Sequence, residues 1–144
     1  MRWRALLLLS CGACINGSDM QALPNDQLEP FAELAQPVLE TRCANPSCHG
    51  NGERPLAVFA VHRYRMDESS TFVDAPLTEE ELRLNLLRAA LFTVDLEHAS
   101  DSMLLVKPRS RHADVDVFTD DADFDYRRLH GWIETAMHDR AAAP

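Results

Sequence analysis

Residues 41–50 read T-R-C-A-N-P-S-C-H-G, and the interpretation of the whole chain depends on them. Cys43 and Cys48 are separated by four residues, and His49 follows the second cysteine directly. The pattern allows three interpretations: a disulfide, part of a zinc site, or covalent attachment of a cofactor. A Cys43–Cys48 disulfide would close a very small loop, so it would stabilise the fold only weakly. It would also leave His49 without a role.

The zinc and cofactor interpretations differ in how many ligands they need. A zinc site needs four ligands, typically from two such pairs, so scattered histidines or carboxylates would have to complete it here. In a C-x-x-C-H sequence the two thiols bind a haem covalently and the next histidine binds its iron. This chain has two additional residues between the cysteines, and an outward turn at Asn45-Pro46 would accommodate them.

The N-terminal residues, M-R-W-R-A-L-L-L-L-S-C, predict an export signal. Two arginines precede an apolar run that is too short to span a bilayer. The end of that run, L-L-S-C, resembles the lipidation site of a bacterial lipoprotein, with Cys11 as the lipidated residue; Cys14 gives a better length but a poorer match. We expect residues 1–13 to be a signal peptide, 14–27 a tether and 28–140 the folded domain. The alternative is an ordinary N-terminal core segment.

Composition excludes several classes of function. The chain has 144 residues, which fits one domain, with 23 Asp plus Glu against 14 Lys plus Arg. It shows no basic patch for nucleic acid and no G-x-S-x-G, H-E-x-x-H or phosphate-loop sequence. The acidic stretch 114–125 fails the calcium-loop pattern, because Phe118 stands at a ligand position and the required glycine is absent. We interpret it as a solvated loop whose charge would steer a basic redox partner.

Apolar residues at helical spacing predict an all-α domain. A first helix is expected from Leu28 to Cys43, with a kink or a second start at Pro37. Thr78 and Glu81 have the spacing of a capping box, and the helix that follows should run to about residue 92. A short helical turn is expected at S-M-L-L-V, residues 102–106.

A closing helix follows the acidic stretch. Asp121 or Asp123 is expected to cap it. Gly131 weakens this helix by roughly 1 kcal/mol relative to alanine, and one reason for a glycine there would be the close approach of another backbone. The expected buried face comprises Leu129, Trp132, Ile133 and Ala136.

Three segments resemble exported cytochrome c domains of bacterial lipoproteins: Q-P-V-L-E-T-R-C-A-N-P-S-C-H-G (36–50), S-M-L-L-V-K-P (102–108) and D-Y-R-R-L-H-G-W-I (125–133). In that family a helix ending in P-V-L-E-x-x-C precedes Cys-His-Gly, and D-Y-x-x-L-x-x-W-I lies on the closing helix. The resemblance covers roughly residues 28–137. It implies a class I-like cytochrome c fold, with a few helices around one covalently attached haem and the first and last helices crossing beside it.

The resemblance also implies a set of ligands. One haem c would be attached through Cys43 and Cys48, with His49 as the proximal ligand. Related families take the distal ligand from the loop before W-I. Here that loop contains no methionine, so His112 is its only good iron ligand. Met103 is the alternative, although a methionine at helical spacing with leucines is more often a core residue.

We therefore expect an electron carrier rather than an enzyme, with iron cycling between Fe(III) and Fe(II). The expected location is the periplasm or the outer membrane, with a lipid anchor. The expected partners are redox proteins, including basic ones, and no nucleic acid. One alternative is a non-redox exported binding or structural domain with a Cys43–Cys48 disulfide. Another is a peroxidase-like enzyme with an open haem position. The residues expected to keep water from the haem are Leu39, Leu86, Leu104, Leu105, Trp132 and Ile133, and the resemblance implies that Trp132 lies near the haem crevice.

Overall fold

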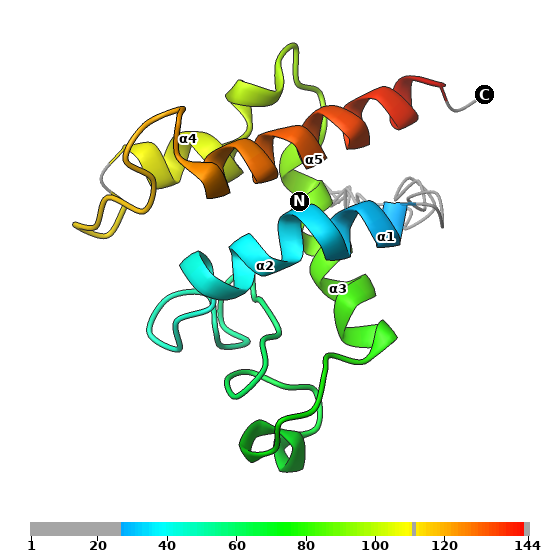
Figure 1. Ribbon diagram of the computed structural model, residues 1–144, viewed down its shortest axis with the longest axis vertical. Coiled ribbons are helices and arrows are strands. Elements are labelled where there is room, and N and C mark those ends of the chain that lie inside the picture. Colours follow the sequence, from blue (N-terminus) through cyan, green and yellow to red (C-terminus); the bar gives the residue numbers. More distant parts are fainter. Residues whose placement is uncertain (1–26, 111, 143–144) are drawn as a thin grey trace, which may run out of the picture.

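The computed structural model describes residues 27–110 and 112–142 (Figure 1). All regular structure in these residues is helical and none of them forms a strand, which confirms the all-α class. The one strand-like pairing among them is an isolated bridge between His112 and Val115. No helix within the described ranges is long and apolar enough to cross a membrane. The predicted signal peptide, Cys11 and all but the last residue of the predicted tether lie outside these ranges.

The helical elements follow one another with short connections. The N-terminal segment comprises α1 (Leu28–Pro30), a π-helical stretch (Phe31–Ala35), α2 (Gln36–Val38) and a second π-helical stretch (Leu39–Cys43). The remaining elements are a 3₁₀ helix (Glu68–Phe72), α3 (Glu79–Ala90), two 3₁₀ turns (Leu91–Thr93 and Ala99–Asp101), α4 (Met103–Arg109) and α5 (Phe124–Ala142).

The N-terminal segment stays helical through Pro37, as Figure 1 shows, and a new α-helical stretch, α2, begins at Gln36 with Pro37 in its first turn. Proline lacks the N–H that would bind the carbonyl of Glu33. In the structure that carbonyl accepts a hydrogen bond from the guanidinium of Arg128 on α5. Bonds on either side of Pro37 span five residues, because the N–H of Gln36 binds Phe31 and that of Ala44 binds Leu39. The expected second start is present as the beginning of α2, and the segment stays helical there because a side chain from α5 replaces the missing bond.

The start of α3 confirms the predicted capping box. The Thr78 hydroxyl accepts from the N–H of Glu81, and the Glu81 carboxylate accepts from the N–H of Thr78. The helix ends at Ala90 and continues as one 3₁₀ turn to Thr93, close to the expected end.

The last helix, α5, packs against the N-terminal helix, and the two run in opposite directions in Figure 1. Trp132 is fully buried and meets Phe31 edge to face, with ring centroids 5.2 Å apart. Asp123 caps α5 by accepting from the N–H groups of Asp125 and Tyr126. Asp121, the other predicted cap, instead forms an ion pair with Arg109. The predicted buried face is confirmed for Leu129, Trp132, Ile133 and Ala136.

Gly131 does not serve a close backbone approach. A Cβ built at Gly131 would meet no atom of the described residues within 4 Å, leaving aside the helix's own neighbouring backbone. The expectation of a close contact was therefore wrong, and the glycine costs α5 stability without allowing another segment to approach.

Residues 61–78, called here the 61–78 loop, extend from the end of the molecule opposite α5 (Figure 1). A buried ion pair holds this loop to α3, because the Arg65 guanidinium binds both carboxylate oxygens of Glu81 at 3.0 Å. Arg65 also donates to the carbonyls of Ala75 and Pro76. The loop is thus organised around one arginine.

Candidate functional site

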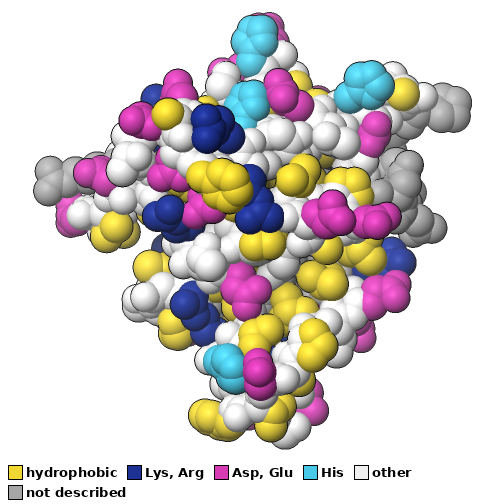
Figure 2. Space-filling model, in the orientation of Figure 1, with side chains coloured by type: hydrophobic (Ala, Val, Ile, Leu, Met, Phe, Trp, Pro, Cys, Tyr) yellow, Lys and Arg dark blue, Asp and Glu magenta, His cyan; other side chains and the backbone are white. Residues whose placement is uncertain are grey.

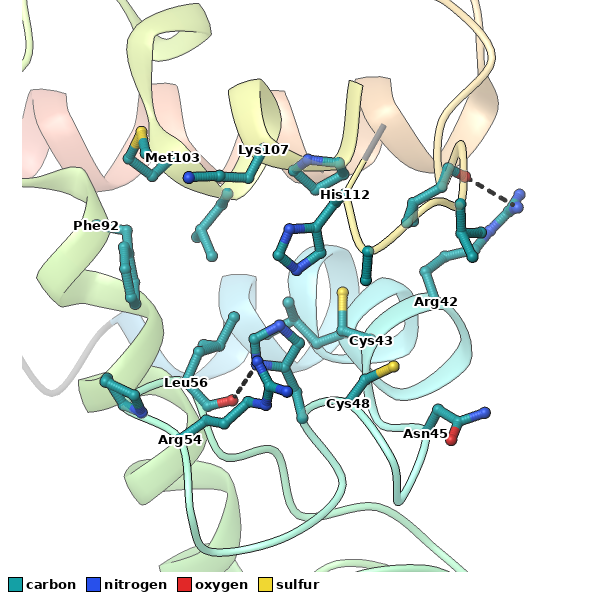
Figure 3. A pocket seen from close by; sticks show the side chains of 18 of the residues that line it. Arg42, Cys43, Asn45, Cys48, Arg54, Leu56, Phe92, Met103, Lys107 and His112 are labelled. Atoms are coloured by element: carbon teal, nitrogen blue, oxygen red, sulfur yellow. Dashed lines mark hydrogen bonds between the residues drawn. The ribbon is translucent and has the colours of Figure 1, made fainter. Parts of the chain in front are cut away.

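A cavity of about 730 Å³ lies between the cysteine-containing loop and α4. Its floor is formed by residues 42–56 and its roof by α4 together with residues 112–117, as Figure 3 shows. This volume falls within the range of about 300–1,000 Å³ typical of small-molecule and cofactor sites. All five residues proposed from the sequence as haem ligands or attachment points line it: Cys43, Cys48, His49, Met103 and His112.

The additional residues between the two cysteines form an outward turn, as expected. The carbonyl of Asn45 accepts from the N–H groups of Cys48 at 2.8 Å and Gly50 at 2.9 Å. The Asn45 side chain accepts from the N–H of Ser47 at 3.0 Å. Asn45 and Pro46 are both exposed. The insertion is therefore accommodated at the surface, while Cys43 and Cys48 remain at the cavity.

Gly50 allows the chain to fold back closely behind His49. A Cβ at this position would lie 2.2 Å from the carbonyl oxygen of Ala44, which is a backbone atom that cannot rotate away. The glycine of the Cys-His-Gly sequence is therefore required by packing in this loop.

His49 presents one ring nitrogen to the cavity in a fixed orientation. Its Nδ1 lies 2.8 Å from the carbonyl oxygen of Leu56, so Nδ1 carries the proton and donates. Burial lowers the pKa of His49 most strongly, the Leu56 hydrogen bond opposes this, and the nearby His112 and Arg54 lower it further. The neutral ring has Nε2 available as a metal ligand, and an imidazole held this way is typical of metal-binding histidines.

His112 faces His49 from the roof. The two ring centroids are 5.9 Å apart and the ring planes differ by 12°. Figure 3 shows the His112 side chain pointing down into the cavity, toward the floor where the dashed line marks the bond between His49 and Leu56. His112 is the first residue of a tight turn, in which the Val115 N–H donates to the His112 carbonyl. Ala113 and Asp114, the two central residues of the turn, have positive φ. Non-glycine residues at positive φ are uncommon, and such strain is frequent beside ligand sites.

Both cysteines are free thiols. Burial raises the pKa of Cys43 to about 12, and the neighbouring Cys48 adds to the effect. Cys43 is therefore protonated at neutral pH, which disfavours thiolate chemistry such as spontaneous disulfide exchange. Figure 3 shows Cys43 and Cys48 side by side at one side of the cavity.

The remaining predictions about the cavity are met in part. Met103 is 44% exposed and lines the roof, so it is not the core residue that its spacing suggested. Leu39 and Leu104 are buried and line the cavity. Trp132 lies in the core against Phe31, which is the simplest interpretation of its place in the helical pattern, and it is not among the residues that line the cavity. Leu86, Leu105 and Ile133 are likewise buried in the core away from the lining.

Sequence reasoning missed the charges of the cavity. Arg42, Arg54 and Lys107 line it, and no carboxylate does among the described residues. The Arg42 guanidinium is paired with Asp125 at 2.7 Å. Neither Arg54 nor Lys107 has a sequence context that separates it from an ordinary surface cation, so nothing in the sequence identified them.

No group of three or more His, Cys, Asp or Glu side chains within the described ranges could hold a metal ion on its own. Haem iron takes four ligands from the porphyrin and only axial ligands from the protein. Comparison of the chain with protein families, curated proteins and solved structures found no match.

Proposed function

We propose that this chain is a c-type cytochrome domain that transfers electrons through one covalently attached haem. The observation that carries the proposal is the pair of imidazoles, His49 and His112, facing each other 5.9 Å apart across the cavity. His49 directly follows two free thiols that line the same cavity. Two opposed imidazoles beside two thiols are a suitable donor set for a haem c with two histidine ligands.

The spacing of the two rings suits a single metal ion between them. A bond between a metal ion and an imidazole nitrogen is about 2 Å long. Two imidazole nitrogens that bind the same ion therefore lie about 4 Å apart. The distance between the ring centroids is longer than this by about half the width of each ring. The centroid separation of 5.9 Å is close to that length, and the rings, which are stacked in this structure, would have to turn their Nε2 atoms toward each other to share one ion.

A haem bound here supplies one-electron exchange between Fe(III) and Fe(II). The protein supplies the ligands and the environment. His49 would bind the iron through Nε2 while its Nδ1 is held by Leu56, and His112 would be the second protein ligand. Two histidine ligands would leave no coordination position for a substrate, which favours electron transfer over a peroxidase reaction. The buried side chains of Leu39, Leu56 and Leu104 line the cavity and exclude water, which helps set the potential.

Met103 is the alternative sixth ligand, because it lines the same roof and is partly exposed. His112 is favoured by its position opposite His49, with the ring centroids 5.9 Å apart. Ligation by two histidines should give a lower potential than ligation by histidine and methionine. It should also give no methionine–iron charge-transfer band in the oxidised protein.

The finer parts of the proposal concern fold and location. The packing of the N-terminal helix against α5 supports a class I-like cytochrome c arrangement. Export as a periplasmic or outer-membrane lipoprotein, lipidated at Cys11, is proposed from the N-terminal sequence. Partners would be redox proteins, and the net charge of −9 favours basic ones. Cys11→Ser should release the protein from membranes or block its processing, and mass spectrometry of the first peptide would identify the true N-terminus.

The decisive experiment is expression together with a cytochrome c maturation system, followed by haem staining on a denaturing gel. The parent protein should keep its haem on the gel, whereas Cys43→Ala/Cys48→Ala should lose it. His112→Ala should convert a low-spin iron to high spin, while the matched Met103→Leu leaves the spectrum nearly unchanged. A parent protein that carries no haem would refute the proposal, and the reverse spectral outcome would assign the sixth ligand to Met103.

A further inference from the structure

The cavity carries charge of the opposite sign to the protein as a whole. The chain has a net charge of −9, yet the charged side chains that line the cavity are all cationic: Arg42, Arg54 and Lys107. In an acidic protein, random placement would bring carboxylates to such a surface. A cationic lining in this position indicates a ligand that carries negative charge.

The three cations are not equivalent. Arg42 is already neutralised, because it pairs with Asp125 at 2.7 Å and lies 3.9 Å from Asp123. Neither Arg54 nor Lys107 forms a side-chain hydrogen bond or ion pair with any other residue that the structure describes. These two side chains therefore retain their full capacity to bind an anion.

Arg54 and Lys107 approach the cavity from different walls. Arg54 belongs to the floor, close enough to lower the pKa of His49, and Lys107 extends from α4 in the roof. Figure 3 shows the Lys107 ammonium on the side of the cavity away from Cys43 and Cys48. The floor and the roof thus each provide one imidazole and one unpaired cation.

We infer that Arg54 and Lys107 bind the two carboxylates of the haem and so select a dicarboxylate porphyrin over a neutral one. The inference rests on the proposed function, and it adds an orientation to it. The thiols attach one edge of the porphyrin, and the cations bind the edge that carries the carboxylates. Arg54 can form a two-point bond with a carboxylate, whereas Lys107 acts as a point charge.

Reversible binding to full-length Cys43→Ala/Cys48→Ala protein tests this inference, because the cofactor can then be titrated and followed by absorbance. The probes are haem and its dimethyl ester, which has the same ring but no ionised carboxylates. Arg54→Gln and Lys107→Gln should each weaken haem binding about fivefold, as for a partly exposed ion pair. Binding of the ester should not change.

Arg109→Gln is the matched control, because it removes one positive charge from α4 at a residue that does not line the cavity and pairs with Asp121. It should leave the preference for haem over its ester unchanged. Equal weakening of haem and ester by the Arg54 and Lys107 substitutions would overturn the inference. So would a parent protein that binds both probes equally well.

The covalent protein provides a second measurement if the cysteine-free protein does not take up haem. Resonance Raman modes of the haem propionates should shift in Arg54→Gln and Lys107→Gln and stay in place in Arg109→Gln. Unshifted modes in a haem-containing protein would overturn the inference and leave the proposed function intact. A protein that binds no haem in any form would refute both.

Discussion

The cavity and the 61–78 loop both contain arginines, but their arginines are used differently. In the 61–78 loop, Arg65 is 4% exposed, and its guanidinium is bound by Glu81 and by backbone carbonyls. Glu81 in turn accepts from the backbone N–H groups of Met66 and Thr78. In the cavity, Arg54 and Lys107 have no such partners among the described residues.

The buried pair in the 61–78 loop is a structural site, whereas the cavity has the features of a binding site. Buried charges need to be paired and hydrogen-bonded within the protein, and the Arg65–Glu81 pair meets that requirement completely. The cavity instead brings together two thiols, two imidazoles and two cations, which form few hydrogen bonds or ion pairs with one another. Groups of this kind are stabilised by something that the chain itself does not supply.

Removal of Arg65 should have the largest effect on folding. Arg65→Ala leaves the buried Glu81 carboxylate without its cation, and breaking such a pair costs about 3–5 kcal/mol of unfolding free energy. Denaturant unfolding of the purified protein measures the loss. The haem spectrum of the folded variant should be unchanged, because no residue of this pair lines the cavity.

Arg83→Ala is the matched control, since Arg83 pairs with Glu79 one turn away on the exposed side of α3. Such a pair contributes about 0.3–0.5 kcal/mol. Comparable losses for Arg65→Ala and Arg83→Ala would mean that the 61–78 loop is not organised by its buried pair. A changed haem spectrum in Arg65→Ala would mean that the two regions are coupled.

The sequence predicts the capping box at the start of α3 but not the buried ion pair that Glu81 forms with Arg65. The spacing of Thr78 and Glu81 predicts a capping box because both partners lie within one helical turn. The second role of Glu81 depends on Arg65, which lies 16 residues earlier in a segment without periodicity. No local pattern distinguishes that arginine from an exposed one. The same limitation applies to the bond that replaces the one missing at Pro37, since Arg128 lies 95 residues after the carbonyl it binds.

Acid should weaken the 61–78 loop through Glu81. Burial alone would raise the pKa of Glu81, but hydrogen bonds from Arg65, Met66 and Thr78 lower it from 4.5 to about 2. The stabilisation is complete above the unfolded pKa of 4.5 and is lost as the pH falls toward 2. The total is about 3 kcal/mol. Urea unfolding across this range should show a steeper pH dependence for the parent than for Glu81→Gln, and equal slopes would contradict the prediction.

A change in the floor of the cavity should have an intermediate effect. Gly50→Ala places a Cβ against the Ala44 carbonyl oxygen, where the built distance is 2.2 Å. Overpacking of this kind costs about 1–3 kcal/mol. Because the clash lies next to Cys48 and His49, the yield of attached haem should fall as well. Unfolding measurements and haem staining report the two effects, and wild-type values in both would show that the loop can adjust.

Much of the candidate site was predictable because it lies in one short segment. Cys43, Cys48 and His49 lie within seven consecutive residues, so any fold brings them close together. His112 was predicted from its place in the loop before W-I, and the structure brings it opposite His49. Met103 was expected in the core, yet α4 turns it toward the cavity and solvent. That outcome depends on how α4 rotates against its neighbours, which helical spacing alone does not specify.

Gly131→Ala should have the smallest effect and the opposite sign, and it provides the reference for the Gly50 result. Both positions receive the same methyl group, but a Cβ at Gly131 meets no atom of the described residues within 4 Å beyond the local helix backbone. The remaining effect is helix propensity, which favours alanine over glycine by about 1 kcal/mol in a helix interior. Gly131→Ala should therefore raise the midpoint of unfolding and leave the haem spectrum and the attachment yield unchanged. A loss of stability at Gly131 would contradict the prediction. The Gly50 result could then no longer be assigned to a clash in the floor of the cavity, because the same methyl group would destabilise the protein even where the structure leaves room for it.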